Sequence, residues 1–299
     1  MRNPEENITR RDFIRTATYT SLAVAMGLFP EEEKKVELPK KTKVVLVRDP
    51  EVIDAKGRVN AKVIQKMLDQ AVTTLFDKKE PVEAWKLLVK PKDVVGIKSN
   101  VWYHLPTPKE LEQAIKKRVM DAGVPEKNID VDDRGVLGSR VFRKSTALFN
   151  ARPFRTHHWS GVGGCIKNYI MFVSQPPKYH GNSCADLGAL WNLPMVKDKT
   201  RLNVLVLLTP LFYGVGAHHF DSTYIWDYKG ILVGTDPVAL DAVGLHLFEA
   251  KRLAYFGQKR PIKPPAHHIF FADTKHKLGT SDLKKIELIK LGWKEGILI

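Results

Sequence analysis

Residues 93–98, with the sequence Asp-Val-Val-Gly-Ile-Lys, are a short apolar run of the kind that forms a buried strand. A helix is predicted at 109–122, because Gly123 and Pro125 follow it in the usual order of a helix end. Residues 128–133 predict another strand. A strand, a helix and a strand in succession imply a crossover connection between parallel strands. The segment therefore predicts an α/β fold with a mostly parallel sheet and crossover helices.

The same alternation continues on both sides of this segment. Further elements are expected from β-branched runs, helical periodicity and an Asp-Pro helix start: strands at 42–47, 201–208 and 230–233, and helices at 61–76, 185–191, 237–251 and 281–291.

The α/β domain is expected to span 42–299, with lobes at 42–150 and 151–299 and a crevice between them. Ligand crevices lie at the carboxyl ends of parallel strands. The loops after Lys98, Asp132 and Leu208 are therefore expected to meet at the site.

The chain is strongly basic, since 48 Lys and Arg residues against 33 Asp and Glu residues give a net charge of +15. Its lysines are scattered rather than gathered in a stripe with aromatic residues between them, which argues against nucleic acid as a partner. The charge instead favours a small anionic ligand or adhesion to an anionic envelope.

The N-terminal residues have the pattern of an export signal. Arg10 and Arg11 precede a weakly apolar run at 17–29. This order predicts a twin-arginine signal over 1–30, followed by a linker at 31–41. The twin-arginine export machinery is then a partner, and the protein is expected in the periplasm or otherwise outside the cytoplasm. The alternative interpretation is an amphipathic first helix. No other apolar run reaches the roughly 18–20 residues that a membrane span requires.

Residues 155–168 gather many ligating and hydrogen-bonding groups. Two imidazoles, a thiol, an ammonium, a guanidinium and a carboxamide flank a loop with three glycines. Glycine lets the backbone approach a ligand closely. The stretch therefore predicts a functional site.

Five landmarks lie in order between residues 43 and 249. They are Val-Gly-Ile-Lys-Ser-Asn at 95–100, Asp-Ala-Gly-Val at 121–124, Arg-Thr-His at 155–157, Ile-Lys-Asn at 166–168 and Val-Gly-Thr-Asp-Pro-Val-Ala-Leu-Asp-Ala-Val at 233–243. Together they resemble the DUF362 family, uncharacterised α/β proteins of which some also carry a ferredoxin module. The resemblance implies the fold and no single reaction. With two cysteines in the chain, neither that module nor a conventional four-cysteine iron–sulfur cluster is expected.

Two lysine–asparagine pairs predict an anion site. Lys98 with Asn100, and Lys167 with Asn168, each place an ammonium near a carboxamide, and such groups hold carboxylates and phosphates. Both lysines are candidate catalytic residues.

The same loop offers further groups. Arg155 and the backbone N–H groups of Gly163 and Gly164 are expected to contact the anion. His157 is the candidate general acid or base.

Two aspartates are expected to orient the anion-binding side chains and His157 without contacting the substrate themselves. They are Asp236 and Asp241, although Asp236 before a proline also fits a helix N-cap.

The histidines and cysteines also suggest a transition-metal site, because imidazole and thiolate bind zinc, iron and copper. The candidate ligands are His157, His158, Cys165, Cys184, His218 and His219, with His180 as a further ligand. Alternatively, Cys165 and Cys184 form a disulfide, worth about 3 kcal/mol for a loop of this length. His267 and His268 are expected at the surface.

The sequence thus predicts an exported enzyme that acts on a small anionic substrate with a bound metal or cofactor, with redox or isomerisation chemistry preferred. Two alternatives remain: a periplasmic metal- or ligand-binding protein without catalysis, and an envelope structural protein held by the disulfide. The sequence names neither the cofactor nor the reaction.

Overall fold

The computed structural model describes residues 41–216 and 219–299. The predicted signal at 1–30, residues 31–40 of the predicted linker, and His218 lie outside the described residues.

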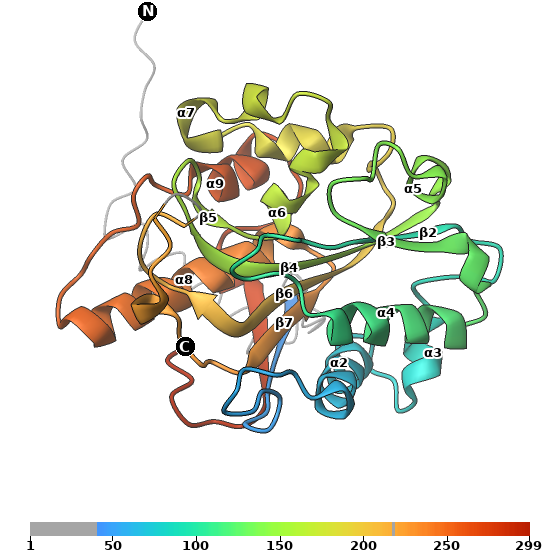
Figure 1. Ribbon diagram of the computed structural model, residues 1–299, viewed down its shortest axis with the longest axis horizontal. Helices are drawn as coiled ribbons and strands as arrows, with labels where there is room; N and C mark the ends of the chain where they lie inside the picture. The colour runs from blue at the N-terminus through green and yellow to red at the C-terminus, as the bar shows by residue number, and fades with distance from the viewer. Residues whose placement is uncertain (1–40, 217–218) are drawn as a thin grey trace, which may run out of the picture. The chain divides into compact units, whose positions relative to one another are not determined.

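Eight strands of the described residues form one mixed sheet, in which four parallel pairs outnumber three antiparallel ones (Figure 1). The strands are β1 (Thr42–Arg48), β2 (Val95–Lys98), β3 (Ile129–Asp132), β4 (Ala147–His157), β5 (Gly161–Gly163), β6 (Thr200–Leu211), β7 (Gly230–Gly234) and β8 (Ile286–Gly292). Their order is β3-β2-β4-β6-β7-β1-β8, and β5 pairs with β4. The predicted α/β class with a mostly parallel sheet is confirmed, and the sheet takes strands from both 42–150 and 151–299.

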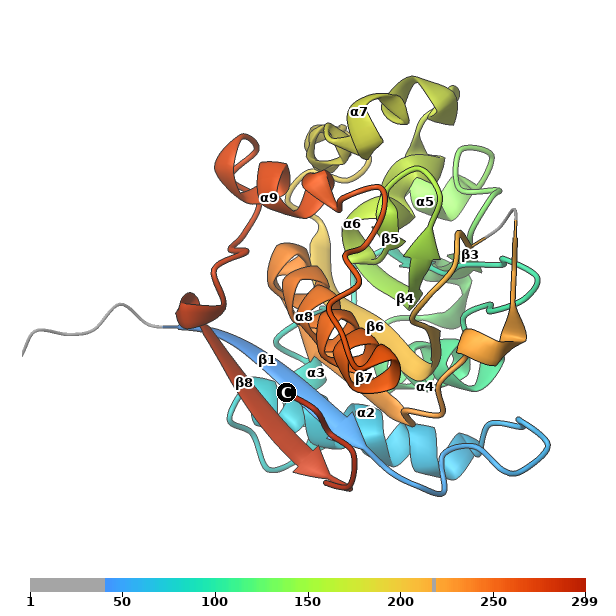
Figure 2. The ribbon, with the colours of Figure 1, turned by 90° about the vertical axis from the view of Figure 1, so that its left-hand side faces the viewer.

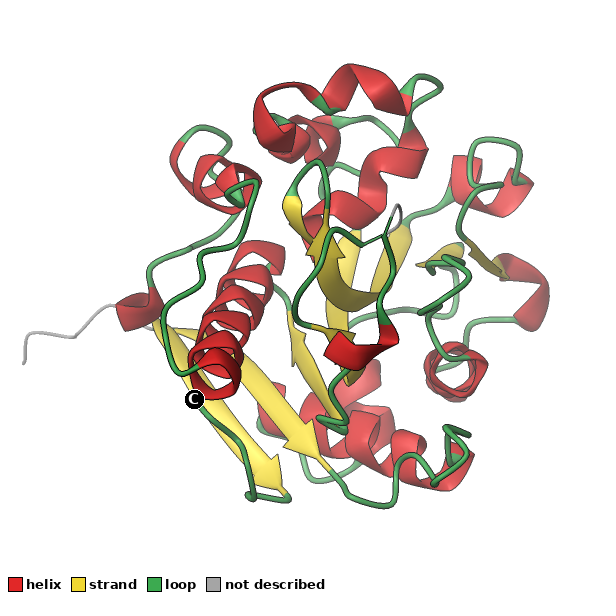
Figure 3. Cartoon of the chain, turned by 60° about the vertical axis from the view of Figure 1, so that its left-hand side comes forward, coloured by secondary structure: helices red, strands yellow, loops and turns green. Residues whose placement is uncertain are grey.

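Helices cover both faces of this sheet, as Figure 3 shows. The helices are α2 (Ala61–Leu75), α3 (Pro81–Trp85), α4 (Lys109–Asp121), α5 (Arg140–Lys144), α6 (Cys165–Asn168), α7 (Gly181–Cys184), α8 (Pro237–Phe256) and α9 (His267–Thr274). None of these described helices combines the length and the apolar character that crossing a bilayer requires.

The alternation of side chains along each strand builds two cores. On β1, Val45 and Val47 join the cluster that contains the buried faces of α2 and α4, whereas Val44 and Leu46 join the one that contains α8. Successive residues of a strand point to opposite faces. Both faces of the strand are thus buried, which explains the continuous apolar run at 42–47.

Helix α2 begins where the sequence places its cap. The side chain of Asn60 accepts hydrogen bonds from the backbone N–H groups of Lys62 and Val63, at 3.1 and 3.3 Å. A capping side chain of this kind satisfies amides that the first turn leaves without partners. The apolar stripe from Ile64 to Leu75 then packs on the sheet.

The predicted helix at 281–291 is wrong. Residues Ile286–Gly292 form β8, which pairs in parallel with β1 at the edge of the sheet (Figure 2). Ile286 is buried and Glu287 is exposed, an alternation with the period of a strand. The neighbouring strand therefore outweighs the helical propensity of the Lys- and Leu-rich sequence.

Strands β3, β2, β4 and β6 run in one direction. Their carboxyl ends therefore lie at the same edge of the sheet. Lys98 ends β2, Asp132 ends β3 and His157 ends β4. Topology thus brings Lys98 and Asp132, two of the predicted strand ends, to one edge of the sheet, whereas β6 runs past Leu208 and ends at Leu211.

Candidate functional site

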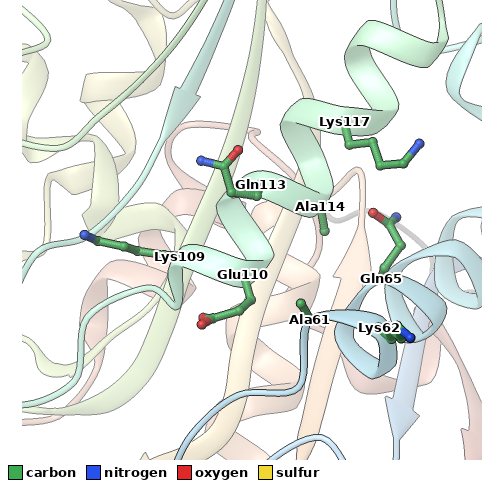
Figure 4. Close-up of a pocket in the computed structure, with 8 residues that line it drawn as sticks. All are labelled: Ala61, Lys62, Gln65, Lys109, Glu110, Gln113, Ala114 and Lys117. Carbon is green, nitrogen blue, oxygen red and sulfur yellow. The ribbon is translucent and has the colours of Figure 1, made fainter.

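A cavity of about 380 Å³ opens at this edge of the sheet. We call it the basic pocket, and its polar lining includes Asn100, Arg152, Arg155, His157, Lys167 and Asn168. A larger hollow of about 730 Å³ lies between α2 and α4 (Figure 4). Of the residues that line that hollow only Ala114 is buried, so no buried ionisable group faces it. The basic pocket is therefore the candidate site.

Arg152 is the most unusual residue of the pocket. Arg152 is only 3% exposed, and its Nε has no hydrogen-bond partner among the described residues. Burial lowers its pKa, against the opposing effect of the Asp133 and Asp241 carboxylates. Guanidinium keeps its proton even so. A buried cation without an acceptor is costly, so the pocket is poised for an anion.

Arg155 provides a second buried guanidinium. It donates one hydrogen bond to Asn100 Oδ1 at 3.2 Å and lies over the ring of Trp102 at 4.3 Å. Its Nε has no partner in the described part of the chain. Burial lowers its pKa, and the charge of Arg152 lowers it further. Arg155, which the sequence predicts to contact the anion, therefore lies in the pocket and can donate a further hydrogen bond to a ligand.

Lys98 is fully buried and its ammonium is fully used. It donates to Asp133 Oδ1, to the carbonyl of Ser99 at 2.7 Å and to Asn168 Oδ1 at 3.4 Å. Burial lowers the pKa of Lys98 to about 8, although the Asp133 carboxylate opposes the shift. Three acceptors exhaust the three donors of an ammonium. Lys98 thus connects the loop after β3 to α6 beneath the pocket, which is a structural role.

Lys167, unlike Lys98, lines the pocket. The one acceptor that the structure gives to its amine within the described residues is the thiol of Cys184, with Nζ and Sγ 3.6 Å apart. Burial lowers the pKa of Lys167 to about 8. Its amine therefore takes up and releases protons near neutrality.

His157 is 8% exposed, and its Nδ1 accepts the backbone N–H of Trp159 at 3.2 Å. Burial, followed by the charges of Lys167 and Arg152, lowers its pKa far below the ordinary range. The ring is therefore neutral with its proton on Nε2. In this state His157 donates a hydrogen bond, which fits the acid rather than the base in the general acid or base role that the sequence suggests.

Comparison with known proteins identifies part of the chain. Residues 111–246 match DUF362, a domain of unknown function. No curated protein matches the chain, and no solved structure does. The matched segment is narrower than the 43–249 expected from the sequence landmarks.

The DUF362 segment contains most of the basic pocket, including both arginines, His157 and Lys167. Lys98 and Asn100 come from β2 and the loop after it, ahead of the match. The pocket therefore joins the DUF362 segment to the strand that precedes it.

Within this segment, Asp241 of α8 positions α6. Its two carboxylate oxygens accept the backbone N–H groups of Cys165 and Ile166, at 2.7 and 2.9 Å. Burial raises the pKa of Asp241 to about 7, and these two hydrogen bonds oppose the shift. Asp241 thus fixes the start of the short helix that carries Lys167 and Asn168.

Gly163 and Gly164 make room for charged side chains. A Cβ on Gly163 would lie 2.8 Å from Arg152 Nη2, and one on Gly164 would overlap the carboxylate of Asp241. Side chains at these two positions are therefore excluded by Arg152 and Asp241, and the contact of the glycine amides with an anion stays a prediction.

Gly164→Ala is expected to lower the free energy of unfolding by about 2–3 kcal/mol, because α6 and α8 must separate to admit the methyl group. Urea denaturation measures the change. Gly181→Ala is the matched control, since no atom lies within 4 Å of the added Cβ there. Equal stability of the two variants would contradict the prediction.

A network of asparagines ties the pocket to the sheet. Asn168 Nδ2 donates to Asn150 Oδ1 at 2.8 Å, and Asn150 Nδ2 donates to Asn203 Oδ1 at 2.9 Å. All three residues are almost fully buried. Buried and satisfied amides hold one arrangement in place, so Asn168 is fixed by β4 and β6.

Asp236 does not reach the pocket residues. Its carboxylate accepts Val238 N at 2.8 Å and Ala239 N at 3.0 Å, and also Thr280 N at 2.9 Å. The predicted orienting role is therefore replaced by helix capping, the alternative that the Asp-Pro sequence offers.

The predicted metal ligands do not form a cluster in the described part of the chain. No three His, Cys, Asp or Glu side chains among 41–216 and 219–299 are placed to hold a metal ion. His219 is exposed.

Both cysteines are free thiols in this structure, and both are buried. The disulfide between Cys165 and Cys184 stays a prediction that a thiol count tests.

His267 is exposed as expected, but His268 is fully buried, so its expected surface position is wrong. It lies on α9, whose inner side packs on the elements around the pocket. Burial lowers its pKa to about 3, and the charges of Lys167 and Arg152 add to the shift.

The sequence interpretation missed Arg152, Asp133 and Trp102. Arg152 and Arg155 are three positions apart, so a regular strand would point them to opposite faces. The pairing of β4 with β6 is irregular between Pro153 and Arg155, and both arginines line one pocket. The sequence feature that could have indicated Arg152 is the pair of arginines on either side of Pro153-Phe154, inside an apolar run.

Proposed function

We propose that this protein is an enzyme that binds a small molecule with at least two negative charges in the basic pocket. The observation that carries the proposal is Arg152, a buried guanidinium whose Nε has no hydrogen-bond partner among the described residues. Lys98 and Asp133 offset each other as an ion pair. Asp241 is the other carboxylate that acts on Arg152, so Arg152, Arg155 and Lys167 together leave a surplus of positive charge. A dianionic carboxylate or phosphate would offset that surplus.

The groups beside this anion support proton-transfer chemistry. Lys167 has a pKa of about 8, so its amine can remove or return a proton at neutral pH. His157 presents a neutral Nε2–H that can donate to a developing negative charge, as an oxyanion-stabilising group does. These two roles suit isomerisation of an anionic substrate through loss of a proton next to its carboxylate.

The test begins with binding. We expect the reduced, full-length protein to bind one equivalent of sulfate, phosphate or malonate in titration calorimetry. Lys117→Gln, in the hollow of Figure 4, is the control that should bind equally well. The absence of binding at millimolar concentrations of all three anions would contradict the proposal.

Catalysis is tested by deuterium exchange. Nuclear magnetic resonance in heavy water should show loss of a C–H signal next to the carboxylate in one or more compounds of a panel of 2-hydroxy and 2-keto dicarboxylic acids. Binding without exchange by any of them would favour the alternative of a non-catalytic ligand-binding protein.

The affinity for sulfate is expected to fall above pH 8. Sulfate keeps both charges across this range, whereas Lys167 loses its proton as the pH rises through its pKa of about 8. The protonated amine attracts the anion, so affinity is full below the pKa and decreases by up to about tenfold per pH unit above it. Calorimetry from pH 6 to 9.5 measures the slope. Lys167→Arg should flatten it, and a wild-type profile without a slope would remove Lys167 from the anion site.

We also propose that residues 1–30 direct export through the twin-arginine machinery, on the sequence pattern of Arg10 and Arg11. Replacing both arginines by lysine should retain the protein in the cytoplasm in a fractionation experiment. Unchanged fractionation would contradict this localisation.

A further inference from the structure

The contact between Lys167 and Cys184 is chemically unusual. Lys167 is 3% exposed and Cys184 is fully buried, and Nζ and Sγ lie 3.6 Å apart. A buried amine usually finds carboxylate or carbonyl acceptors. Here a thiol, which is a weak acceptor, is the one partner that the structure gives to the amine among the described residues.

The backbone holds the thiol in this position. Asn182, Ser183 and Cys184 have φ angles of 47°, 54° and 60°, so three successive residues other than glycine occupy the left-handed region. Each such residue costs about 1 kcal/mol or more. The fold therefore maintains an unfavourable turn that ends at the thiol.

The two cysteines differ in their neighbours. The thiol of Cys165 lies against the carboxylate of Asp241, so burial and this negative charge both raise its pKa. Burial also raises the pKa of Cys184, but Lys167 and the hydroxyl of Ser160 oppose the shift. A thiolate is the form that reacts with oxidants. Of the two, Cys184 is therefore the one whose neighbours, Lys167 and Ser160, favour the thiolate form.

We propose that Lys167 and Cys184 are a modification site, at which peroxide joins them through a covalent bond between Nζ and Sγ. The proton of the thiol first moves to the amine. The thiolate then attacks hydrogen peroxide: an S–O bond forms, the O–O bond breaks, and the departing hydroxide takes a proton from Lys167 to leave as water. Sulfur is oxidised by two electrons and peroxide is reduced by two.

The second step uses the amine that the first step leaves neutral. Nζ attacks the sulfur of the sulfenic acid, an S–N bond forms, the S–O bond breaks, and the hydroxide leaves as a second water with a proton from the amine. The overall change is thiol, amine and one peroxide to a sulfenamide and two waters. Condensation of a sulfenic acid with a nitrogen is a known step of cysteine oxidation. An excess of thiol reverses it, because the thiol attacks the sulfur and releases the amine.

The link has a consequence that rests on the proposed function. Lys167 lines the basic pocket, and a sulfenamide nitrogen carries no charge at neutral pH. Oxidation would then weaken anion binding at the site, and reduction would restore it.

The decisive experiment maps the oxidised protein. The full-length chain is treated with one to ten equivalents of hydrogen peroxide, then digested without reduction and analysed by mass spectrometry. We expect a peptide pair joined between residues 167 and 184 that has lost two hydrogens and separates on addition of dithiothreitol.

Two variants separate this link from a disulfide, which has the same mass change. Cys165→Ser should still form it, whereas Lys167→Gln should give sulfenic or sulfinic acid at Cys184 without a cross-link. A joined peptide pair between 165 and 184, or a wild-type map without a link to 167, would overturn the proposal. Anion binding measured on the reduced protein is independent of this map, so either proposal can fail alone.

Discussion

Arg152→Met is expected to abolish anion binding and to leave the protein at least as stable as the wild type. The guanidinium is buried and its Nε has no acceptor in the described residues, so its removal relieves a desolvation cost and should raise the free energy of unfolding by about 1–2 kcal/mol. Loss of charge-assisted hydrogen bonds to the anion should lower the affinity for sulfate at least about 100-fold.

Titration calorimetry and urea denaturation of the same preparation measure the two effects. The matched control is Arg118→Met, because the guanidinium of Arg118 is paired with the carboxylates of Asp69 and Asp121. That variant should lose stability and keep its affinity. If Arg152→Met instead lost stability and kept its affinity, Arg152 would be a structural residue and the proposed function would lose its main support.

Asp133→Leu is expected to lower the free energy of unfolding by about 3–5 kcal/mol. The substitution leaves the ammonium of Lys98 buried without its carboxylate, and it also removes the acceptor of Val101 N at 2.9 Å. Breaking one side of a buried ion pair costs more than the pair contributes, because the remaining charge is uncompensated.

The double variant Lys98→Met/Asp133→Leu should recover most of this loss, since it removes both charges. Glu126→Gln breaks the exposed pair with Lys116 and should leave stability nearly unchanged. Chemical denaturation of the four proteins completes the comparison. A single variant within about 1 kcal/mol of the wild type would show that the pair is not a major support of the fold.

Local sequence patterns were enough for most of the fold. The run at 42–47 and the strand–helix–strand at 93–133 needed only periodicity and helix-end signals, because local propensity and tertiary structure agree there. The strand at 286–292 could not be predicted from local patterns, because its partner β1 is more than two hundred positions away in sequence. Propensity within such a window cannot include a distant partner.

The site was predictable in location and less so in role. Topology alone brings Lys98, His157 and Lys167 to one edge of the sheet. The roles depend on which acceptors surround each group, and these acceptors come from elsewhere in the chain. Asp133 turns Lys98 into a structural residue, and the backbone N–H of Trp159 turns His157 into a donor.

The hydrogen bonds from Cys165 and Ile166 to Asp241 also constrain the order in which the protein assembles. Asp241 follows Cys165 by 76 positions. A ribosome that adds about 5–20 residues per second therefore needs roughly 4–15 s to supply it. Throughout that interval the nascent chain already carries both pocket arginines and Lys167 but lacks the helix that anchors α6. The pocket therefore cannot be completed until α8 has been synthesised.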